Sequence, residues 1–230
     1  MTAKAMILAA GLGQRMRPLT DTLPKPMLSA GGKPLLQYHL EALAAAGITE
    51  VIINLAYLGE KIKAFAGKGE GFGLRITYSQ EPEPLETAGA LLHALPLLGD
   101  SPFILLNGDV WTDYPLLALT HHSLRTNQDA HLVLVPNPEF HPEGDFSPDP
   151  HGVLEDNSQL QKFTFAGVSL IHPRLIAGYP NQRTKFPLGE VIRHGISRGR
   201  ISSEIYLGGW SDVGTPDRLA QLNARLSASP

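Results

Sequence analysis

Short apolar runs that are rich in β-formers alternate with helical patterns through the first two thirds of the chain, and this alternation is the strongest constraint on the fold. Strands are predicted at residues 5–10, 51–56, 74–79, 103–107 and 131–135. Helices are predicted between them, at residues 34–46, 59–66, 87–98 and 115–126. Alternating strands and helices build a mostly parallel sheet with helices on both faces. We therefore expect an α/β protein with a Rossmann-like sheet.

The pattern changes after Pro136, where a stretch rich in Pro, Gly, Asp and Asn begins. Apolar runs resume with "TFAGVSLIHP", which predicts one more strand. The tail is predicted as helix, strand and helix, at residues 188–198, 201–207 and 216–226. Because strands return after it, the stretch predicts a small lobe inserted over about 137–190, not a linker. No fixed-period repeat is present. The length of 230 residues suits one large core, so residues 1–230 are predicted to form a single domain.

The composition indicates a small-molecule ligand and excludes several classes of protein. The formal net charge of −3 argues against a surface that coats nucleic acid. The absence of cysteine excludes disulfides and thiolate metal sites and suits the cytoplasm. No apolar run approaches the ~20 residues of a membrane span, and "MTAKAMILAA" is too short an apolar run for a signal peptide. We expect a soluble cytoplasmic protein, with a monomer as the working hypothesis, that binds small molecules and neither nucleic acid nor membrane.

The stretch from Leu8 to Pro26, "LAAGLGQRMRPLTDTLPKP", follows the first predicted strand and is typical of a phosphate-binding loop. Its glycines let backbone N–H groups approach a ligand, and its prolines keep the segment out of a helix. A dinucleotide-binding loop needs a third glycine where Met16 stands, and a P-loop needs Lys followed by Ser or Thr where Gln14 and Arg15 stand. The remaining alternative is a plain turn whose cations are solvated. Three prolines and three cations in one loop argue against this alternative, the cations being Arg15, Arg17 and Lys25.

The longer sequence "LAAGLGQRMRPLTDTLPKPMLSAGGKPLL" resembles the signature of the sugar-1-phosphate nucleotidylyltransferases, which reads G-x-G-x-R-(M/L)-x-P-L-T, then P-K-P, then G-K-P. The resemblance extends to "NGDVW" at 107–111 and "WSDVGTP" at 210–216, and so covers nearly the whole chain. Within the family, the short chain and "EPLETAGALLHALPLL" are most similar to bacterial uridylyltransferases that act on N-acetylmuramate 1-phosphate in cell-wall recycling. The resemblance implies an enzyme that joins UTP and this sugar phosphate and releases pyrophosphate.

Two anions must meet in such a reaction. Positioning and cations therefore carry most of the catalysis, and no protein nucleophile is needed. The resemblance implies that Arg15 neutralises the departing pyrophosphate and that Lys25 reaches the α-phosphate and the attacking phosphate. It also implies that the backbone at Ala10, Gly11 and Gly13 contacts the nucleotide.

Two aspartates are candidate ligands for a metal ion. Asp109 ends the predicted strand in "LLNGDV", where functional groups of such sheets lie, and Asp212 follows "GGWS" far along the chain. Taken alone, Asp109 is better explained as a turn residue after Gly108, and Asp212 as a helix cap. The resemblance reverses this and implies that the two carboxylates bind Mg²⁺ together with substrate phosphates. Asp113 is as easily a cap for the helix predicted from Pro115.

The segment "QEPEPLETAGA", residues 80–90, leads from a strand into a helix and has small residues that let a flat base lie close to the backbone. We expect nucleotide contacts from Glu81, which can accept the ring N–H of the base, and from Ala88 and Gly89. A solvated carboxylate is an equal alternative for Glu81. The adjacent Gln80 leaves the register open, because related thymidylyl enzymes commonly use a glutamine here.

The E-K-P segment of the family, whose lysine contacts the sugar phosphate, is missing, and "GDFSPDPHGVLED" and "FTFAGVSL" stand in its place. We expect the sugar contacts to come from four other residues: Asn107, Asp145, Glu155 and Gly167. A muramic sugar also carries a lactyl ether with a carboxylate. Three residues near the lobe could supply a cation for it: Arg174, Arg183 and Lys185.

Several alternatives stay open. Mannose-1-phosphate guanylyltransferases have a similar "EPLGTAG" loop. In the present sequence, Glu86 stands where that loop has its first glycine. Glucose-1-phosphate thymidylyl- or uridylyltransferases are another possibility within the family. A glycosyltransferase usually carries Asp-x-Asp at its metal, which "GDVWTD" does not provide. A nucleotide-sugar sensor without activity is disfavoured by the retention of Arg15, Lys25, Asp109 and Asp212.

Overall fold

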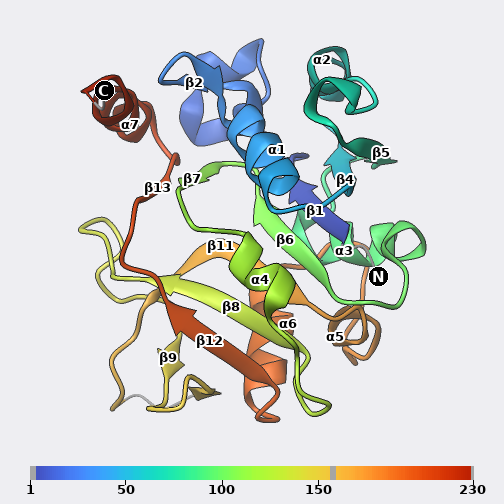
Figure 1. Ribbon diagram of the computed structural model, residues 1–230, viewed down its shortest axis with the longest axis vertical. Coiled ribbons are helices and arrows are strands. Elements are labelled where there is room, and N and C mark those ends of the chain that lie inside the picture. Colours follow the sequence, from blue (N-terminus) through green and yellow to red (C-terminus); the bar gives the residue numbers. More distant parts are fainter. Residues whose placement is uncertain (1–3, 156–158, 229–230) are drawn as a thin grey trace.

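The computed structural model describes residues 4–155 and 159–228, and its centre is a seven-stranded sheet (Figure 1). The strands of the sheet are β1 (Lys4–Leu8), β4 (Glu50–Leu55), β5 (Arg75–Gln80), β6 (Phe103–Asn107), β8 (Ala130–Val135), β11 (Thr164–Ile171) and β12 (Ile201–Ile205). They are ordered β12, β8, β11, β6, β1, β4, β5 across the sheet. The stretch from Leu8 to Pro26, called the glycine-rich loop below, therefore follows β1, which has β6 on one side and β4 on the other.

The sheet is mostly parallel, as predicted. Every pairing in it is parallel except the two made by β11, which runs antiparallel to both β6 and β8. The register of β11 on β8 shifts between Phe165 and Ser169, around Gly167, whose φ is 73°. Glycine adopts a positive φ at little cost, so Gly167 permits this irregularity in a central strand.

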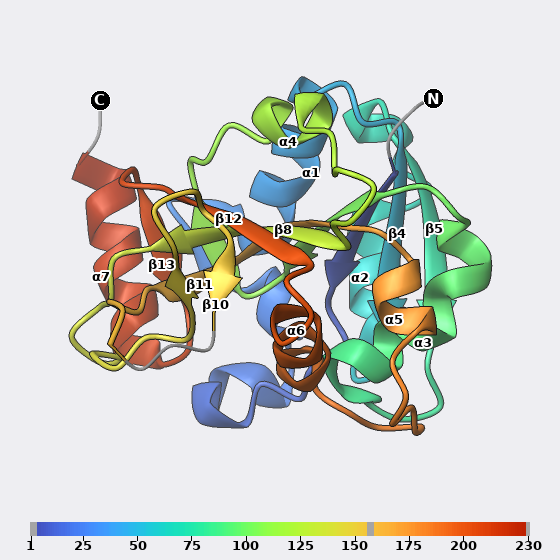
Figure 2. The same ribbon diagram turned by 90° about the horizontal axis from the view of Figure 1, so that it is seen from below.

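Helices cover both faces of the sheet, which confirms the predicted layers (Figure 2). The α-helices are α1 (Leu35–Ala45), α2 (Gly59–Ala66), α3 (Glu86–Leu98), α4 (Leu117–His121), α5 (Arg174–Ala177), α6 (Leu188–Ile196) and α7 (Pro216–Ala228). The shorter 3-10 helices are η1 (Gln14–Met16), η2 (Leu19–Asp21), η3 (Lys25–Met27) and η4 (Glu70–Phe72). In the described part of the chain, no helix is long and apolar enough to cross a membrane.

Alternate side chains of each strand enter two separate cores, one on each face of the sheet. In β1, Ala5 and Ile7 pack with residues of α1, α2 and α4, whereas Met6 packs with residues of α3, α5 and α6. Successive side chains of a strand point to opposite faces, so a strand covered on both faces is apolar throughout. This explains why the sequence shows continuous apolar runs.

The helix α4 is shorter than the one predicted over 115–126. It ends at His121, and His122 is already extended, with φ −73° and ψ 126°. The ring of His122 stacks on that of His131 in β8, with 3.8 Å between the ring centroids. This contact with the sheet replaces further helical turns that the local pattern favours.

Three two-stranded ladders among the described residues lie outside the main sheet. They are β2 (Ser29–Ala30) with β3 (Lys33–Pro34), β7 (Val110–Thr112) with β13 (Trp210–Asp212), and β9 (Ser147–Pro148) with β10 (Leu154–Glu155). The ladder of β7 and β13 brings a segment near the end of the chain beside the segment that follows β6. Leu222 of α7 packs with Met16 and Leu28 of the glycine-rich loop region, so the last helix also reaches this end of the molecule.

Only part of the range predicted as an inserted lobe, 137–190, lies outside the central sheet. Residues 137–155 and 159–163 contain the ladder of β9 and β10, together with an isolated bridge between Phe146 and Phe163. The rest of the range returns to the core, because β11 lies between β8 and β6 and helices α5 and α6 pack on one face. Residues 156–158 of the predicted lobe, and residues 1–3 and 229–230 at the ends of the chain, are outside the described residues.

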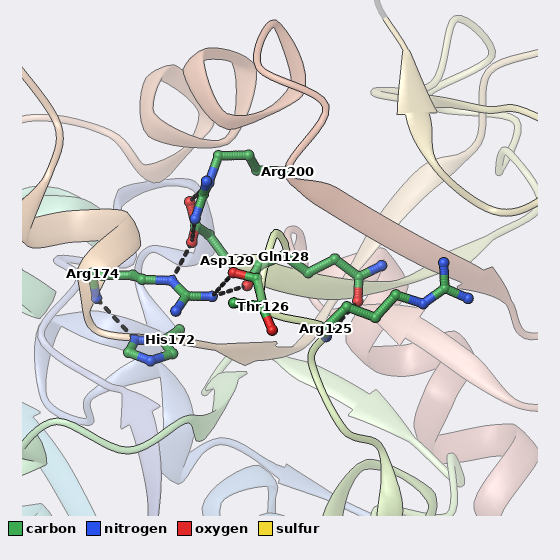
Figure 3. A network of polar contacts seen from close by, with 7 residues as sticks. All are labelled: Arg125, Thr126, Gln128, Asp129, His172, Arg174 and Arg200. Atoms are coloured by element: carbon green, nitrogen blue, oxygen red, sulfur yellow. Dashed lines mark hydrogen bonds and ion pairs between the residues drawn. The ribbon is translucent and has the colours of Figure 1, made fainter.

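Asp129, just before β8, joins three segments that are distant in sequence (Figure 3). Its carboxylate accepts hydrogen bonds from Nε of Arg174 at 2.5 Å, from Nη2 of Arg200 at 2.7 Å and from Nε of Arg200. Arg174 also donates to the backbone carbonyls of Thr126 and Gln128. Burial alone would raise the pKa of Asp129, but the hydrogen bonds from the two arginines hold it below its ordinary value. The network ties the starts of β8 and β12 to α5.

We predict that Asp129→Asn lowers the free energy of unfolding by about 2 kcal/mol at pH 7, because charge-assisted hydrogen bonds to two arginines are lost. A carboxyl with a lowered pKa in the folded state stabilises above its unfolded pKa of about 3.9 and loses that contribution as the pH falls through its folded pKa. The difference between wild type and variant should therefore be constant from pH 7 to 5 and shrink below about pH 4. Urea unfolding across this range measures it. The exposed Asp100→Asn is the control, and an equal loss in both variants would contradict the network's role.

Candidate active site

Two cavities lie at the carboxyl ends of the central strands and share Asn107 and Asp109. The first has a volume of about 220 Å³ and is lined by residues 8–11, 25–26 and 84–87 with Asn54, Glu81, Asn107 and Asp109. The second has a volume of about 410 Å³ and is lined by Arg15, Asn107, Asp109, Val110, Phe140, His141, Asp145, Thr164, Phe165, Trp210, Asp212 and Arg218. Ligands of open α/β sheets bind at this edge. Two small ligands could thus lie next to each other here.

The glycine-rich loop supplies part of the first cavity. Ala10 and Gly11 line it, and a Cβ at position 11 would meet no atom within 4 Å. Gly13 lines neither cavity. It has a φ of 61° and its carbonyl accepts a hydrogen bond from the hydroxyl of Thr20 at 2.8 Å. Because a positive φ is costly for other residues, Gly13 shapes the turn, whereas Gly11 leaves the backbone open to a ligand.

Lys25 and Asp109 form an ion pair at the boundary between the two cavities. Nζ of Lys25 lies 2.5 Å from Oδ2 of Asp109, and Lys25 is only 9% exposed. Pro24 and Pro26 flank the lysine and restrict its backbone. Before Asp109, the N–H of Gly108 donates to the carbonyl of Leu8 at 2.9 Å, and a Cβ on Gly108 would stand 2.5 Å from that oxygen. Only glycine permits this close approach of β1 and β6, which directs Asp109 toward the lysine.

Asp212, the second predicted metal ligand, reaches the same place through the ladder of β7 and β13. It lies opposite Val110, and the N–H of Val213 donates to the carbonyl of Asp109 at 3.0 Å. Nη1 of Arg218 lies 2.7 Å from Oδ2 of Asp212. Among residues 4–155 and 159–228, no group of three or more His, Cys, Asp or Glu side chains could hold a metal ion. A cation bound by these two aspartates needs further ligands from a substrate or water.

Glu81, predicted to accept the ring N–H of a base, lies in the wall of the first cavity and is 2% exposed. Its Oε1 accepts a hydrogen bond from Nδ2 of Asn54 at 2.7 Å, and its Oε2 accepts one from the N–H of Leu85 at 3.1 Å. Burial raises the pKa of Glu81, and these two hydrogen bonds oppose the rise. Asn54 in turn accepts from the N–H of Ala9 at 2.8 Å. The carboxylate thus links the glycine-rich loop to residues 81–85.

Ala88 and Gly89, also predicted to contact the nucleotide, line neither cavity. They are buried in α3, where their N–H groups donate to the carbonyl of Phe186 at 3.0 and 3.2 Å. A side chain at position 89 would place its Cβ 2.4 Å from the carbonyl oxygen of Thr184. In this structure their small size serves the packing of α3 against the segment before α6.

Glu86, three residues before Gly89, lines the first cavity with a left-handed φ of 62°. An L-residue in this conformation costs about 1 kcal/mol more than glycine does. The similar "EPLGTAG" loop has its glycine at this position. The left-handed backbone conformation therefore explains why the guanylyl loop has a glycine at this position. In this chain Glu86 adopts the same conformation at the cost of local strain.

Of the four predicted sugar contacts, two line a cavity and two do not. Asn107 and Asp145 line the second cavity. Gly167 lies against Asn107, because a Cβ on Gly167 would stand 2.9 Å from the Cβ of Asn107. Glu155 is exposed in β10 and lines neither cavity. Gly167 is thus a packing residue for a side chain of the cavity, and Glu155 lies elsewhere.

The three cations considered for a substrate carboxylate, Arg174, Arg183 and Lys185, line neither cavity. Each is paired with a carboxylate, which is, in the same order, that of Asp129, Glu190 and Glu83. The arginines that line the second cavity are Arg15 and Arg218. Arg15 was expected from the sequence, whereas Arg218 was not.

Asn54 and Phe140 also line the cavities and were not predicted from the sequence. Asn54 lies near the carboxyl end of β4, next to β1, and this position was a usable signal. Arg218 follows Asp212 by six residues, but its position on a helix gives no hint of a cavity. Phe140 lies in the stretch rich in Pro and Gly, where no periodicity indicates direction.

Residues 4–147 match the family model described as nucleotidyl transferase. The chain is 46% identical over 234 residues to N-acetylmuramate alpha-1-phosphate uridylyltransferase of Neisseria meningitidis, with 98% of this chain and 99% of that protein covered. It is 32% identical to the protein of the same name from Caulobacter vibrioides, with 97% and 96% covered. It is 34% identical to mannose-1-phosphate guanyltransferase of Aspergillus fumigatus, of which it spans 61%. The chain belongs to the nucleotidyl transferase family, among the enzymes that act on sugar 1-phosphates, which confirms the resemblance.

Solved structures share the fold. A putative glucose-1-phosphate thymidylyltransferase from Bacillus anthracis superposes with a TM-score of 0.86 at 21% identity, with 99% of this chain and 96% of that chain covered. HddC from Yersinia pseudotuberculosis, in complex with GMP-PN, superposes with a TM-score of 0.76 at 25% identity, with 97% and 99% covered. The α/β sheet predicted from the sequence is thus the sheet of this family.

We predict that Gly89→Ala lowers the free energy of unfolding by about 1–3 kcal/mol, because the added methyl group must displace the carbonyl of Thr184. Gly71→Ala is the matched control, since a Cβ there meets nothing within 4 Å. Urea unfolding measures both. If Gly89→Ala kept the wild-type stability and only raised the KM for the nucleotide, position 89 would be a ligand contact and not a packing residue.

Proposed function

We propose that this enzyme transfers a uridylyl group from UTP to N-acetylmuramic acid 1-phosphate and releases pyrophosphate. One observation carries the proposal: two cavities meet at Asn107 and Asp109, with Lys25 between them. This geometry suits a reaction in which two separate anionic substrates approach each other. The choice of substrates is supported by the relative named for this activity, which is 46% identical over the full length of both chains. The activity fits the recycling of cell-wall sugars.

In this proposal the first cavity holds the nucleoside, the second holds the sugar phosphate, and the triphosphate passes Lys25 and reaches Arg15 at the edge of the second cavity. The open backbone at Gly11 receives phosphate oxygens, and Lys25 reaches both the α-phosphate and the attacking phosphate oxygen. Arg15 lines the second cavity without a hydrogen bond or ion pair to any described residue, which leaves it available to the departing pyrophosphate. The cations lower the repulsion between the two substrates, and the walls orient the oxygen toward the α-phosphorus.

Magnesium is the metal we propose for the site. Asp109 and Asp212 both line the second cavity, and one or two carboxylates plus substrate phosphates are what Mg²⁺ accepts. Bound there, the ion would neutralise charge on the phosphates. Each carboxylate is paired with a cation, Asp109 with Lys25 and Asp212 with Arg218, so neither is an uncompensated charge in the protein.

We also propose that the protein works in the cytoplasm, where UTP is available, and that it acts as a monomer. Its partners are then the two small substrates. The net charge of −3 gives no support to a nucleic-acid partner.

A second candidate reaction uses GTP and mannose 1-phosphate. It is favoured by relatives at 32–36% identity that are named mannose-1-phosphate guanyltransferase. Glu86 argues against it, because Glu86 lines the first cavity at the position where the guanylyl loop has a glycine. The two reactions share the same transfer mechanism.

A matrix of nucleoside triphosphates against sugar 1-phosphates, read as pyrophosphate released, tests the proposal. We expect the highest kcat/KM for UTP with N-acetylmuramic acid 1-phosphate in Mg²⁺, and no turnover in excess chelator. A higher kcat/KM for GTP with mannose 1-phosphate would overturn the substrates and leave the transfer mechanism standing. Turnover that persists in chelator would contradict the magnesium proposal.

A further inference from the structure

Arg218 and Phe140 lie together at the second cavity, although they come from α7 and from the stretch after β8. The guanidinium carbon of Arg218 lies 3.9 Å from the centroid of the Phe140 ring. The side chain of Arg218 is 14% exposed, whereas Phe140 is 51% exposed. Both line the cavity. The wall therefore presents a nearly buried cation beside an open apolar ring.

The guanidinium of Arg218 is held rigidly from several sides. Nη1 donates to Asp212 at 2.7 Å, and Nε lies 3.4 Å from Oγ1 of Thr215. Gly214 leaves room for it, because a Cβ there would stand 2.3 Å from Nη2. Stacking on Phe140 fixes the plane of the fork.

Donors of Arg218 remain for a ligand. Nη2 has no hydrogen-bond acceptor among residues 4–155 and 159–228, while Nη1 is engaged by Asp212. Nη2 is not among the buried side-chain atoms that lack a partner, so it is open to the cavity, and a carboxylate is the strongest partner for a guanidinium. The other acids of the cavity are already engaged, Asp109 by Lys25 and Asp145 by the N–H of Phe165 at 2.8 Å. A ligand carboxylate that binds Arg218 would thus meet a cation, and the nearby carboxylates that could repel it are already engaged by other groups.

We propose that Arg218 and Phe140 form the subsite for an acidic arm on the sugar, in which the guanidinium binds the carboxylate and the ring contacts the alkyl part. The ligand class is a hexose 1-phosphate that carries a short ether-linked carboxylic acid, and the inference rests on the function proposed above. The larger volume of the second cavity, 410 against 220 Å³, suits a sugar with an added arm. Arg218 thus determines specificity in addition to holding Asp212.

The test compares two sugar phosphates that differ in this arm, N-acetylmuramic acid 1-phosphate and N-acetylglucosamine 1-phosphate, each with UTP. The measured quantity is the selectivity, the ratio of their kcat/KM values, in wild type, Arg218→Gln and Arg218→Lys. We expect Arg218→Gln to lower the selectivity about tenfold or more and Arg218→Lys to keep part of it, because a point charge replaces the fork. Phe140→Ala should lower it by a smaller factor. Arg225→Gln is the matched control, since Arg225 lies on the same helix, stacks on Trp111 at 4.7 Å and lines neither cavity.

The selectivity distinguishes two roles of Arg218, binding the acidic arm of the sugar and holding Asp212. If Arg218 acts only by holding Asp212, Arg218→Gln lowers kcat/KM for both sugars by the same factor and the selectivity stays at the wild-type value, which would overturn the subsite. A wild-type enzyme without preference for the muramic substrate would instead refute the proposed function, and the subsite with it. Thermal unfolding of each variant verifies that the fold is retained.

Discussion

The ion pair between Lys25 and Asp109 is the interaction around which the site is organised. It joins the glycine-rich loop after β1 to the turn after β6, and both residues line the first cavity. Two carboxylates and two anionic substrates cannot share a small site unless cations balance them. The lysine balances Asp109 in the protein and lies where the substrates of the proposed reaction would meet.

The rest of the architecture brings distant segments to this pair. Gly108 allows β1 and β6 to approach so closely that the next residue points to the lysine. The ladder of β7 and β13 then adds Asp212, which is more than a hundred residues away in sequence. Helix α7 packs on the loop region and brings Arg218 to the second cavity. The sheet therefore provides the edge, and a short ladder and the last helix complete the site.

The layers of the fold could be predicted because a short continuous apolar run indicates a strand that is buried on both faces, and β1, β4 and β6 lie close to where their runs place them. The loop signature and its family were equally readable. The turn and packing contacts of Gly13, Ala88 and Gly89 could not be predicted, because a small residue in a turn or a packed helix has the same letter as one that contacts a ligand. Their contacts with a nucleotide stay a prediction. The cavity position of Arg218 depends on how α7 packs, which no local pattern contains.

A double-mutant cycle of Lys25→Ala and Asp109→Asn, followed by pyrophosphate release, tests most directly whether this pair works as a unit. We expect each change alone to lower the rate about a hundredfold or more, and the double variant to be little slower than the worse single variant. Lys33→Ala and Asp113→Asn, which line neither cavity, should keep most of the rate. A near wild-type rate in either single variant, or losses that simply multiply in the double variant, would show that Lys25 and Asp109 do not act as a unit.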